Sequence, residues 1–491
     1  MDFSCFSNII NGKPCGAKST CHGINPATEE ALWEVPCASE DDLKYAVDAA
    51  ERAFSAWSET SYEKRCELVV QYAEKFLNEE KGLIELLMKE TGKPVGWVNK
   101  YHSIRLANLG PHWQRDVADR EIHSSYEGML ETSKDLVYLT WGPSLSNISA
   151  RLSLKVEKIE DEKKTATMRY VPLGNLPSIV SRPLGAMPYT PYTTLKAIEV
   201  GHALFPPGVL QVLGGDDQLG PWMTAHARIQ KISFTGSILT GKKIMEACAK
   251  TLKRVTLELG GNDAAIVCPD VDIEKTAPQV VMSALKNSGQ ICVATKRLYI
   301  HHTIYTPFLT AMTRYISTLK TGDPLSSQSI DLGPLQNAMQ YQKVLDLLAD
   351  CKTNGYTFAT PAPSRGESLE TRPGYFIAPT IIDNPPSHAR VMREEQFGPL
   401  IPAKPYTSTA EVVDAVNDTN TGLGATIWTQ DIEAAEGIAQ RLEVGSVYIN
   451  SALRPDWRVW FGGWKESGIG GERGQKGLEE YCRVRAVHVY K

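Results

Sequence analysis

Two side chains of this chain have the chemistry needed to capture a carbonyl group covalently and then release it with water. Glu258 stands in LELGGND, at the end of an alternating strand pattern, and Cys292 stands in NSGQICVATKR, after a Gly-Gln turn. A thiol is a nucleophile for a carbonyl carbon, and a carboxylate is a general base for water. Upstream, FTGSILTG at 234–241 is a small-residue turn that suits a phosphate. Together these groups predict the oxidation of an aldehyde with a nicotinamide nucleotide.

Each of the two side chains also has an ordinary structural interpretation. A single cysteine is most often a small buried hydrophobic residue, and Glu258 would face solvent if its strand lay at a surface. Against this, Gly289 permits a sharp turn that exposes a sulfur, and Gly260 and Gly261 let main chain approach a bound molecule closely. The glycine pair stands at the carboxyl end of its strand, where open α/β sheets bind ligands. We therefore expect Cys292 and Glu258 to face one cleft.

The size and charge of the chain argue against several classes of protein. With 491 residues it is too long for one hydrophobic core, so two or three domains are expected. A formal net charge of −5 and the lack of a basic block argue against nucleic acid as a partner. No apolar run approaches membrane-spanning length, and the first residues lack the basic start of a signal peptide. We therefore expect a cytoplasmic protein that binds neither membrane nor nucleic acid.

The cysteines and histidines do not follow a metal or disulfide pattern. Ten cysteines are scattered singly without a CxxC pair, and a chain of this size does not need disulfide bonds. His301 and His302 are adjacent, and on a strand they would point to opposite faces. No metal site is therefore expected.

Periodicity predicts helices in the first part of the chain and alternating strands and helices after Tyr170. Ser39 with Asp42 forms a capping box that begins a helix. Strands are expected at 208–215, 231–236, 255–261, 298–301, 375–382, 425–428 and 446–450, and helices at 193–203, 241–252, 307–319 and 338–351. This alternation is typical of an α/β fold with a parallel sheet. The stretch 126–164 indicates a hairpin or an irregular insertion, and the alternating end RVRAVHVYK predicts an edge strand, here or on another subunit.

Five blocks of the sequence together resemble the aldehyde dehydrogenase superfamily, whose members use NAD or NADP. LELGGND is similar to its general-base motif, GQICVATKR to its nucleophile motif and FTGSILTG to its nucleotide motif. EEQFGPL at 394–400 and FGGWKESGIGGERG at 461–474 match two further blocks. The resemblance covers residues 20–122 and 170–491. A weaker resemblance links the chain to fungal aldehyde dehydrogenases of aromatic polyketide pathways of the citrinin type, and hence to secondary metabolism.

The resemblance implies a role for each matched residue. Cys292 would attack the aldehyde to give a thiohemiacetal, and after hydride transfer to the nicotinamide Glu258 would activate the water that hydrolyses the thioester. Glu395 would hold the nicotinamide ribose, with Phe397 packing nearby. The remaining cofactor-binding residues would be Gly236, Ser237, Ile238, Leu239, Thr240, Gly241 and Leu259, with the diphosphate against 236–241.

The resemblance also implies an α/β fold in several parts. A Rossmann-like cofactor-binding domain would take residues 1–122 and 170–259, and an α/β catalytic domain would take residues 260–445. Residues 123–169 would form an irregular insertion or a small β oligomerisation hairpin. Residues 446–491 would return to the cofactor domain and end in a C-terminal oligomerisation arm. The expected assembly is a homodimer or a homotetramer.

One stretch departs from the family pattern. After Val180 the chain continues as SRPLGAMPYTPYTT, so the family's PWNFP loop and the helix and strand behind it are missing, and Gly185 stands where the family has a lysine. The connection from Val180 to Pro188 is too short for a parallel crossover of about a dozen residues. The missing asparagine would donate to an oxyanion, and loss of one such donor costs about 10²–10³ in rate. Part of the cofactor-domain sheet is therefore expected to be missing and the activity to be impaired.

Several alternatives are left open by the sequence. An altered exon junction explains the departure, and so does divergence into a non-catalytic aldehyde-dehydrogenase-like subunit or scaffold. A thiol esterase or acyltransferase that uses Cys292 without a cofactor is a third candidate. The EEQFGPL block and the FTGS turn argue against it, because ester cleavage needs neither.

The substrate and the choice of nucleotide are less well marked. Lys286 stands where the family often has an aromatic residue, and Arg454, Trp457, Arg458 and Trp460 follow from another wall. These residues indicate an aromatic or acidic aldehyde, unless they are solvated residues of the rim. Pro188 stands where the family often has a glutamate that repels NADP, so both NAD and NADP are expected as candidates.

Overall fold

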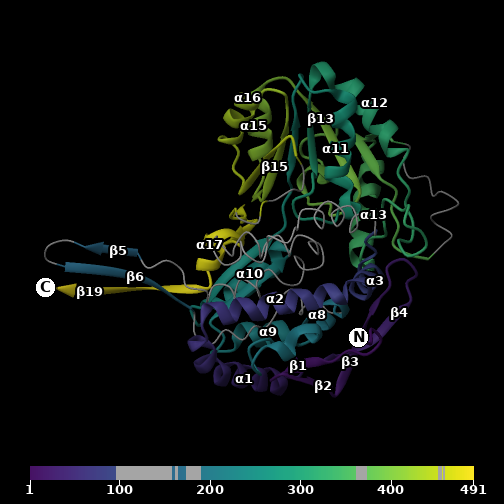
Figure 1. Ribbon diagram of the computed structural model, residues 1–491. Helices are drawn as coiled ribbons and strands as arrows, with labels where there is room; N and C mark the ends of the chain where they lie inside the picture. The colour runs from purple at the N-terminus through teal and green to yellow at the C-terminus, as the bar shows by residue number, and fades with distance from the viewer. Residues whose placement is uncertain are drawn as a thin grey trace.

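The chain folds into two lobes and a projecting arm, which Figure 1 shows with the arm at the left. The computed structural model describes residues 1–94, 157–160, 164–172, 190–360, 373–451, 456 and 459–490. The lower lobe in this view contains the N-terminal helices, and the upper lobe contains a large sheet with helices around it. The expected α/β fold is confirmed.

The lower lobe begins with two short hairpins and a run of helices. The hairpins are β1 (Asn8–Ile10) with β2 (Lys13–Cys15), and β3 (Ser19–Ile24) with β4 (Ala31–Cys37). The helices are α1 (Glu40–Glu59), α2 (Tyr62–Asn78), α3 (Glu80–Thr91), α8 (Tyr192–Gly201), the 3₁₀ turn η1 (His202–Leu204), α9 (Leu219–Ala225) and α10 (Ile238–Ala249). The predicted capping box of α1 is present, because the side chains of Ser39 and Asp42 each accept from the other's main-chain N–H.

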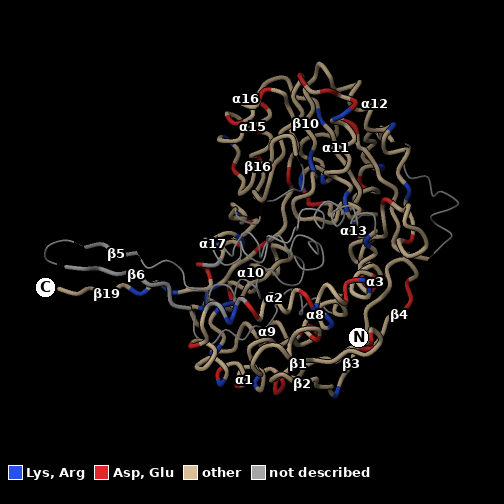
Figure 2. Tube along the Cα trace, viewed as in Figure 1, with Lys and Arg blue, Asp and Glu red and all other residues tan. Residues whose placement is uncertain are grey.

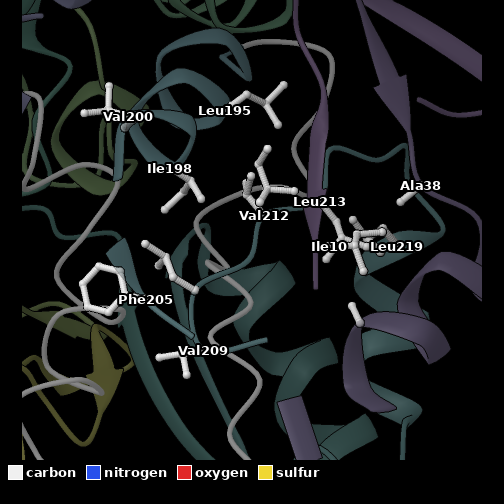
Figure 3. Packing of buried hydrophobic residues seen from close by; sticks show 14 of the residues in the cluster. Ile10, Ala38, Leu195, Ile198, Val200, Phe205, Val209, Val212, Leu213 and Leu219 are labelled. Carbon is white, nitrogen blue, oxygen red and sulfur yellow. The ribbon is translucent and has the colours of Figure 1, made fainter. Parts of the chain in front are cut away.

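Apolar side chains from these helices and from β1 form the core of the lower lobe (Figure 3). Leu195 and Ile198 of α8 pack with Val209, Val212 and neighbouring residues, all of them buried. The strand predicted at 208–215 does not appear as a strand paired along its length among the described residues. The segment is buried, but among the described residues it makes only an isolated bridge between Val212 and Ile9.

A small sheet at the junction of the lobes carries the first catalytic motif. Its order is β18-β8-β7, with β7 (Lys231–Gly236) parallel to β8 (Arg254–Leu259) and β18 (Gly468–Ile469) antiparallel to β8. The part of this sheet that we expected to be missing concerns residues 173–189, which lie outside the described residues. The boundary predicted between the cofactor and catalytic domains, after residue 259, falls at the end of β8.

The upper lobe is built on a seven-stranded sheet of order β11-β12-β13-β10-β9-β15-β16. All neighbours are parallel except β11 and β12 at one edge. The strands are β9 (Ala264–Val267), β10 (Arg297–His301), β11 (Thr357–Phe358), β12 (Thr380–Asp383), β13 (Leu400–Tyr406), β15 (Gly424–Trp428) and β16 (Ser446–Ile449). Outside this sheet, β14 (Thr421–Gly422) pairs with β17 (Trp464–Lys465).

Helices cover both faces of the large sheet. They are α11 (Ile273–Leu285), the 3₁₀ turns η2 (Lys286–Gly289) and η3 (His302–Ile304), α12 (Tyr305–Ile316), α13 (Ala338–Thr353), α14 (Arg390–Arg393), α15 (Thr409–Asn417), α16 (Ile432–Ala439) and, near the small sheet, α17 (Gly474–Glu479). On β9, Ala264 and Ile266 share a core with α13, α15 and α16, whereas Ala265 and Val267 share one with α11 and α12. This alternation follows the two-residue period of a strand, and burial of both faces is typical of parallel sheets.

The arm is a three-stranded antiparallel sheet. Its order is β19-β6-β5, with β5 (Glu157–Glu160), β6 (Lys164–Pro172) and β19 (Cys482–Tyr490). The predicted C-terminal edge strand therefore exists, and one of its edges pairs with β6 of its own chain. The hairpin β5–β6 falls within or beside the predicted insertion, of which residues 123–156 lie outside the described residues.

Three further expectations are corrected by the structure. The helix expected at 241–252 begins at Ile238, because the Ser237 side chain accepts from Thr240 N–H and starts the helix earlier. The strand expected at 375–382 is only β12, because Tyr375 N–H donates to a loop carbonyl of Pro26. The rings of His301 and His302 do not point to opposite faces. They lie 4.5 Å apart, since β10 ends between them and η3 begins.

Charges of both signs are interspersed over the two lobes (Figure 2). No helix within the described ranges is both long and apolar enough to cross a membrane. Among these same residues, no three His, Cys, Asp or Glu side chains are placed to hold a metal ion.

A buried carboxylate on α3 holds the start of α8. Glu90 is 1% exposed, and its side chain accepts from Tyr192 N–H at 2.9 Å and Thr193 N–H at 3.2 Å. The residue before α8 is Pro191, which provides no side-chain cap.

Replacing Glu90 by Ala leaves both N–H groups without this acceptor, so we expect the free energy of unfolding in urea to fall by about 2 kcal/mol or more. As a control, Glu85→Ala on the same helix removes an exposed ion pair with Lys89 and should change it by less than about 0.5 kcal/mol. Equal effects of the two substitutions would contradict this role of Glu90.

Candidate active site

The motifs of the two candidate catalytic residues, Glu258 and Cys292, meet where the small sheet passes into the large one. The chain leaves the carboxyl end of β8 after Leu259 and enters the amino end of β9 at Ala264. The main-chain oxygen of Asp263 accepts from Lys296 N–H at 2.9 Å and from Arg297 N–H at 3.0 Å. The segment after Glu258 is therefore joined to the segment after Cys292.

Gly261 brings the main chains of the two motifs into contact. A Cβ atom at this position would lie 3.3 Å from the Cys292 carbonyl oxygen and 2.8 Å from Leu423 Cβ. Gly261 follows Glu258 by three residues, so the strand that ends in the carboxylate and the turn that carries the thiol lie side by side. A side chain at Gly261 would push them apart.

Glu258 is a buried carboxylate on β8. Its residue is 7% exposed, and it stands opposite Gly468 in the antiparallel pair with β18. Ser467 fixes this end of the strand, because its carbonyl accepts from Leu259 N–H at 2.8 Å and its hydroxyl donates to Gly260 O at 2.8 Å. The interpretation of Glu258 as a polar residue on a solvated strand face is therefore wrong.

A left-handed turn delivers Cys292 from the end of α11. Asn287, Ser288 and Gly289 have φ values of 53°, 55° and 78° in succession, a conformation that is unfavourable for the two non-glycine residues. Side chains hold the turn in place: Ser288 Oγ donates to Gly333 O at 2.7 Å, and Asn287 Nδ2 donates to Gln290 O at 3.1 Å. The sharp turn that the sequence predicted at Gly289 is present, and Cys292 behind it is half-buried.

Lys296 binds the turn from beneath. Its buried ammonium group donates to the carbonyl oxygens of Ile291, Cys292 and Ala294 at 3.0, 2.6 and 3.2 Å. No role was predicted for this lysine, because a Lys-Arg pair in a sequence is usually a solvated face. In the sequence, Lys296 is marked only by its position directly before the largely buried strand β10.

Glu395 connects the turn to the end of β8. Its Oε1 accepts from Gly261 N–H at 3.2 Å and lies 3.5 Å from Lys296 Nζ. A Cβ at Gly260 would lie 2.3 Å from Glu395 Oε2, so a side chain there would displace the carboxylate from this position. The side chain of Glu395 is 24% exposed, and Phe397 beyond it is half-buried with a φ of 49°.

Asp263, the last residue of LELGGND, is a third carboxyl group of the site, and the sequence analysis gave it no role. It is 5% exposed and is surrounded by Gly261, Gly424 and the charged side chains of Lys296 and Glu395. Burial raises its pKa to about 7, and the opposing attraction of the Lys296 ammonium does not cancel this effect. The site therefore contains a carboxyl group that titrates near neutral pH.

The residues expected to bind a dinucleotide diphosphate form an exposed helix start. Ser237 caps α10 through Thr240 N–H at 3.2 Å, and Gly236, Ser237, Leu239 and Thr240 are exposed. Leu239 at this helix start is 67% exposed. Gly241 packs on Leu259 so closely that a Cβ would lie 2.6 Å from it.

These groups fit a nicotinamide dinucleotide chemically. The first N–H groups of a helix lack partners within the helix and attract phosphate. The carboxylate of Glu395, which reaches solvent, is an acceptor suited to ribose hydroxyls. Gly241 packs against Leu259 at the end of β8, and Gly260 lies against the Glu395 carboxylate.

The proposed substrate wall is only partly described. Lys286 is 8% exposed, so the interpretation of this residue as a solvated rim residue is wrong. Trp460 is half-buried and lies against Gly462 and Gly471. Arg454, Trp457 and Arg458 lie outside the described residues.

Comparison with known proteins places this geometry in context. The model of the aldehyde dehydrogenase family matches residues 15–128 and 171–487. The protein "Aldehyde dehydrogenase LUC3" from Fusarium sp. is 37% identical over the full length of both chains. The NAD+ complex of aldehyde dehydrogenase from Bacillus cereus has a TM-score of 0.83 and 27% identity, covering 99% of this chain and 96% of its own. An E. coli NADP-dependent enzyme has a TM-score of 0.83 and 26% identity, covering 100% and 99%.

The turn before Cys292 should depend on Gly289 for two separate reasons. Its φ is +78°, and a Cβ would lie 2.2 Å from the main-chain oxygen of Gly398. We expect Gly289→Ala to lower the free energy of unfolding by several times the cost of a left-handed alanine alone, which is about 1 kcal/mol. It should also slow alkylation of Cys292, because the turn must move.

Gly355 provides the matched control. It has a φ of +68° and no heavy atom within 4 Å of a built Cβ. Gly355→Ala should therefore show only the backbone cost of about 1 kcal/mol. Equal urea denaturation curves for the two variants would rule out the steric role of Gly289.

The buried carboxyl of Asp263 should make stability depend on pH in a defined direction. Because its pKa rises from 3.8 unfolded to about 7 folded, the native state binds more protons than the unfolded state between these values. Stability is therefore expected to fall as pH rises from 4 to 7. Asp263→Asn should reduce this slope in urea denaturation at pH 5 and pH 8. Replacing exposed Glu74 on α2 by Gln should leave it unchanged, and an unaltered slope in the Asn variant would refute the assignment.

Proposed function

The chain belongs to the aldehyde dehydrogenase family, and we propose that it oxidises an aldehyde to a carboxylic acid through a thioester on Cys292. The contact between Gly261 and the Cys292 main chain carries this proposal, because it sets the strand of Glu258 beside the nucleophile turn. Burial of Glu258 supports it further, since a partly desolvated carboxylate is a stronger base than a solvated one.

The two side chains divide the reaction between them. Cys292 Sγ adds to the carbonyl carbon while the thiol proton passes to the carbonyl oxygen, which gives a thiohemiacetal. The carbon then loses hydride, for which a bound nicotinamide would be the acceptor, the hydroxyl proton goes to solvent, and a thioester remains on Cys292. Glu258 then takes a proton from water as the water attacks the thioester, and the acid departs with restoration of the thiol.

The cofactor is NAD or NADP, and we propose residues 236–241, Leu259, Glu395 and Phe397 as its contacts. The exposed start of α10 supports a place for the diphosphate, and the outward face of the Glu395 carboxylate supports one for the ribose. The two solved structures above are described with different nucleotides. The described residues do not favour one nucleotide over the other. Pro188, the position that bears on this choice, lies outside them.

We propose an aromatic or acidic aldehyde as the substrate. A buried lysine at 286, next to the nucleophile turn, supports an anionic group, and half-buried Trp460 supports an aromatic one. The similarity to a Fusarium protein supports a role in fungal secondary metabolism. Equal kcat/KM values for aliphatic, aromatic and carboxylated aldehydes would exclude this substrate class.

A homodimer or homotetramer in the cytoplasm is the proposed state of the enzyme. The outer edge of β19 is unpaired among the described residues, and Val484 and Val489 on it are 56% and 57% exposed. An exposed edge strand is a template for pairing with another chain. Sedimentation as a monomer at micromolar concentration would contradict an oligomer.

The alternative is a non-catalytic subunit or scaffold. The missing PWNFP segment favours it, because an oxyanion donor and a cofactor lysine are lost with that segment. The same loss predicts an impaired rather than abolished rate if Cys292 and Glu258 still act. The two possibilities differ in whether any NAD(P)H is formed.

Substitution of the two catalytic residues tests the proposal. With an aldehyde and NAD+ or NADP+, the unmodified enzyme should form NAD(P)H, and Cys292→Ala should form none. Glu258→Gln should retain a first burst of NAD(P)H and then turn over about 10²–10⁴-fold more slowly, because only hydrolysis of the thioester needs the base. Absorbance at the NAD(P)H band in a stopped-flow instrument separates these phases.

Exposed Cys5 provides the control for the thiol. Cys5→Ala should keep the full rate. Formation of no NAD(P)H by the unmodified protein, with any aldehyde, would favour the scaffold. Ester cleavage without nucleotide that depends on Cys292 would favour the esterase.

A further inference from the structure

The ammonium group of Lys296 lies between the nucleophile turn and a carboxylate. An ammonium group has three protons, and three carbonyl oxygens of the turn lie within 3.2 Å of Nζ, the nearest being that of Cys292 at 2.6 Å. The side chain is 3% exposed. The main chain around the thiol is thus folded about one buried positive charge.

The same ammonium faces Glu395. Its Nζ lies 3.5 Å from Glu395 Oε1, which also accepts from Gly261 N–H. The main chain of Glu395 is fixed separately, because Lys343 Nζ donates to its carbonyl oxygen at 2.7 Å. The carboxylate is the member of this group that reaches solvent.

We propose that Lys296 is a positioning residue that couples binding of the dinucleotide at Glu395 to the reactivity of Cys292. The inference rests on the proposed function, in which Glu395 holds the nicotinamide ribose. Ribose hydroxyls that donate to the carboxylate compete with Lys296 for it. The ammonium then shifts toward the carbonyl oxygens of Cys292 and its neighbours, and the turn tightens around the thiol.

A purely structural role is the competing explanation, and the chain contains a lysine that has only that role. Lys253 is also buried, and its Nζ donates to the carbonyl oxygens of His226 and Ile229 in the lower lobe. It has no ion pair with Glu395 and makes no contact with the nucleophile turn among the interactions of the described residues. Lys253→Met therefore removes a buried ammonium of the same kind without breaking the proposed link.

The test measures alkylation of Cys292 by iodoacetamide, read by mass spectrometry of the full-length protein after digestion, with and without saturating NAD+ or NADP+. In the unmodified protein the nucleotide should change the alkylation rate about fivefold or more, a typical coupling between two sites. In Lys296→Met the ratio of the two rates should fall close to one. Lys296→Arg, which keeps the charge, should retain part of the ratio, and Lys253→Met should retain all of it.

Glu395→Gln breaks the same link from its other side and covers the case in which Lys296→Met does not fold. It should also lower the ratio, and the double variant with Lys296→Arg should lower it no further than Glu395→Gln alone, since the two residues act through one contact. A wild-type ratio in folded Lys296→Met, or in Glu395→Gln with nucleotide bound, overturns the coupling.

Turnover plays no part in this readout. A protein that binds nucleotide and shows the coupling, but forms no NAD(P)H, overturns the proposed function alone. Nucleotide that binds, by quenching of protein fluorescence, without any effect on Cys292 in the unmodified protein overturns the coupling alone. Failure to bind nucleotide at all overturns both.

Discussion

Two hydrogen bonds to one carbonyl oxygen, from Lys296 N–H and Arg297 N–H to Asp263, hold the site together. They set β9 and β10 in register, and the register places the residues before each strand at the same edge of the sheet. The end of β8 and the turn that carries Cys292 therefore arrive at one point. Gly260 and Gly261 make this meeting sterically possible, because Glu395 and the Cys292 carbonyl occupy the space that side chains would take.

The meeting point is unusually rich in buried charge. Asp263, Lys296 and Arg297 are all at most 5% exposed, and partly exposed Glu395 completes the group. Burial of charges is unfavourable unless each finds partners, and here the cations find them in the main chain. Arg297 donates to the carbonyl oxygens of Asn262, Ala415 and Val416, as Lys296 does to those of the turn. Positive side chains thus organise the loops around Cys292 and Glu258, while burial raises the pKa of the Asp263 carboxyl group.

Much of the fold followed from local patterns in the sequence, and the exceptions have physical causes. The alternation of strand and helix after Tyr170 and the capping box at Ser39 were found because their signals are short-range. Glu258, Cys292 and Glu395 each stand within three residues of a glycine, and these motifs are equally local. Lys296 and Asp263 were not predicted, because their environments arise from strands that pair only in the folded chain. Residues 208–215 were predicted as a strand for a related reason. Their apolar pattern predicts burial, but strand pairing depends on other segments of the folded chain.

The pairing of β18 with β8 also bears on how the enzyme is made. Ser467 and Gly468 complete the strand of Glu258, and the hydroxyl of Ser467 reaches a carbonyl 207 residues earlier in the chain. During translation Cys292 leaves the ribosome well before these residues exist. A nascent chain therefore contains Cys292 before β18 is available to pair with the strand of Glu258. Long-range contacts of this kind form late. Under the proposed mechanism, competence for hydrolysis is consequently among the last properties that a newly synthesised molecule acquires.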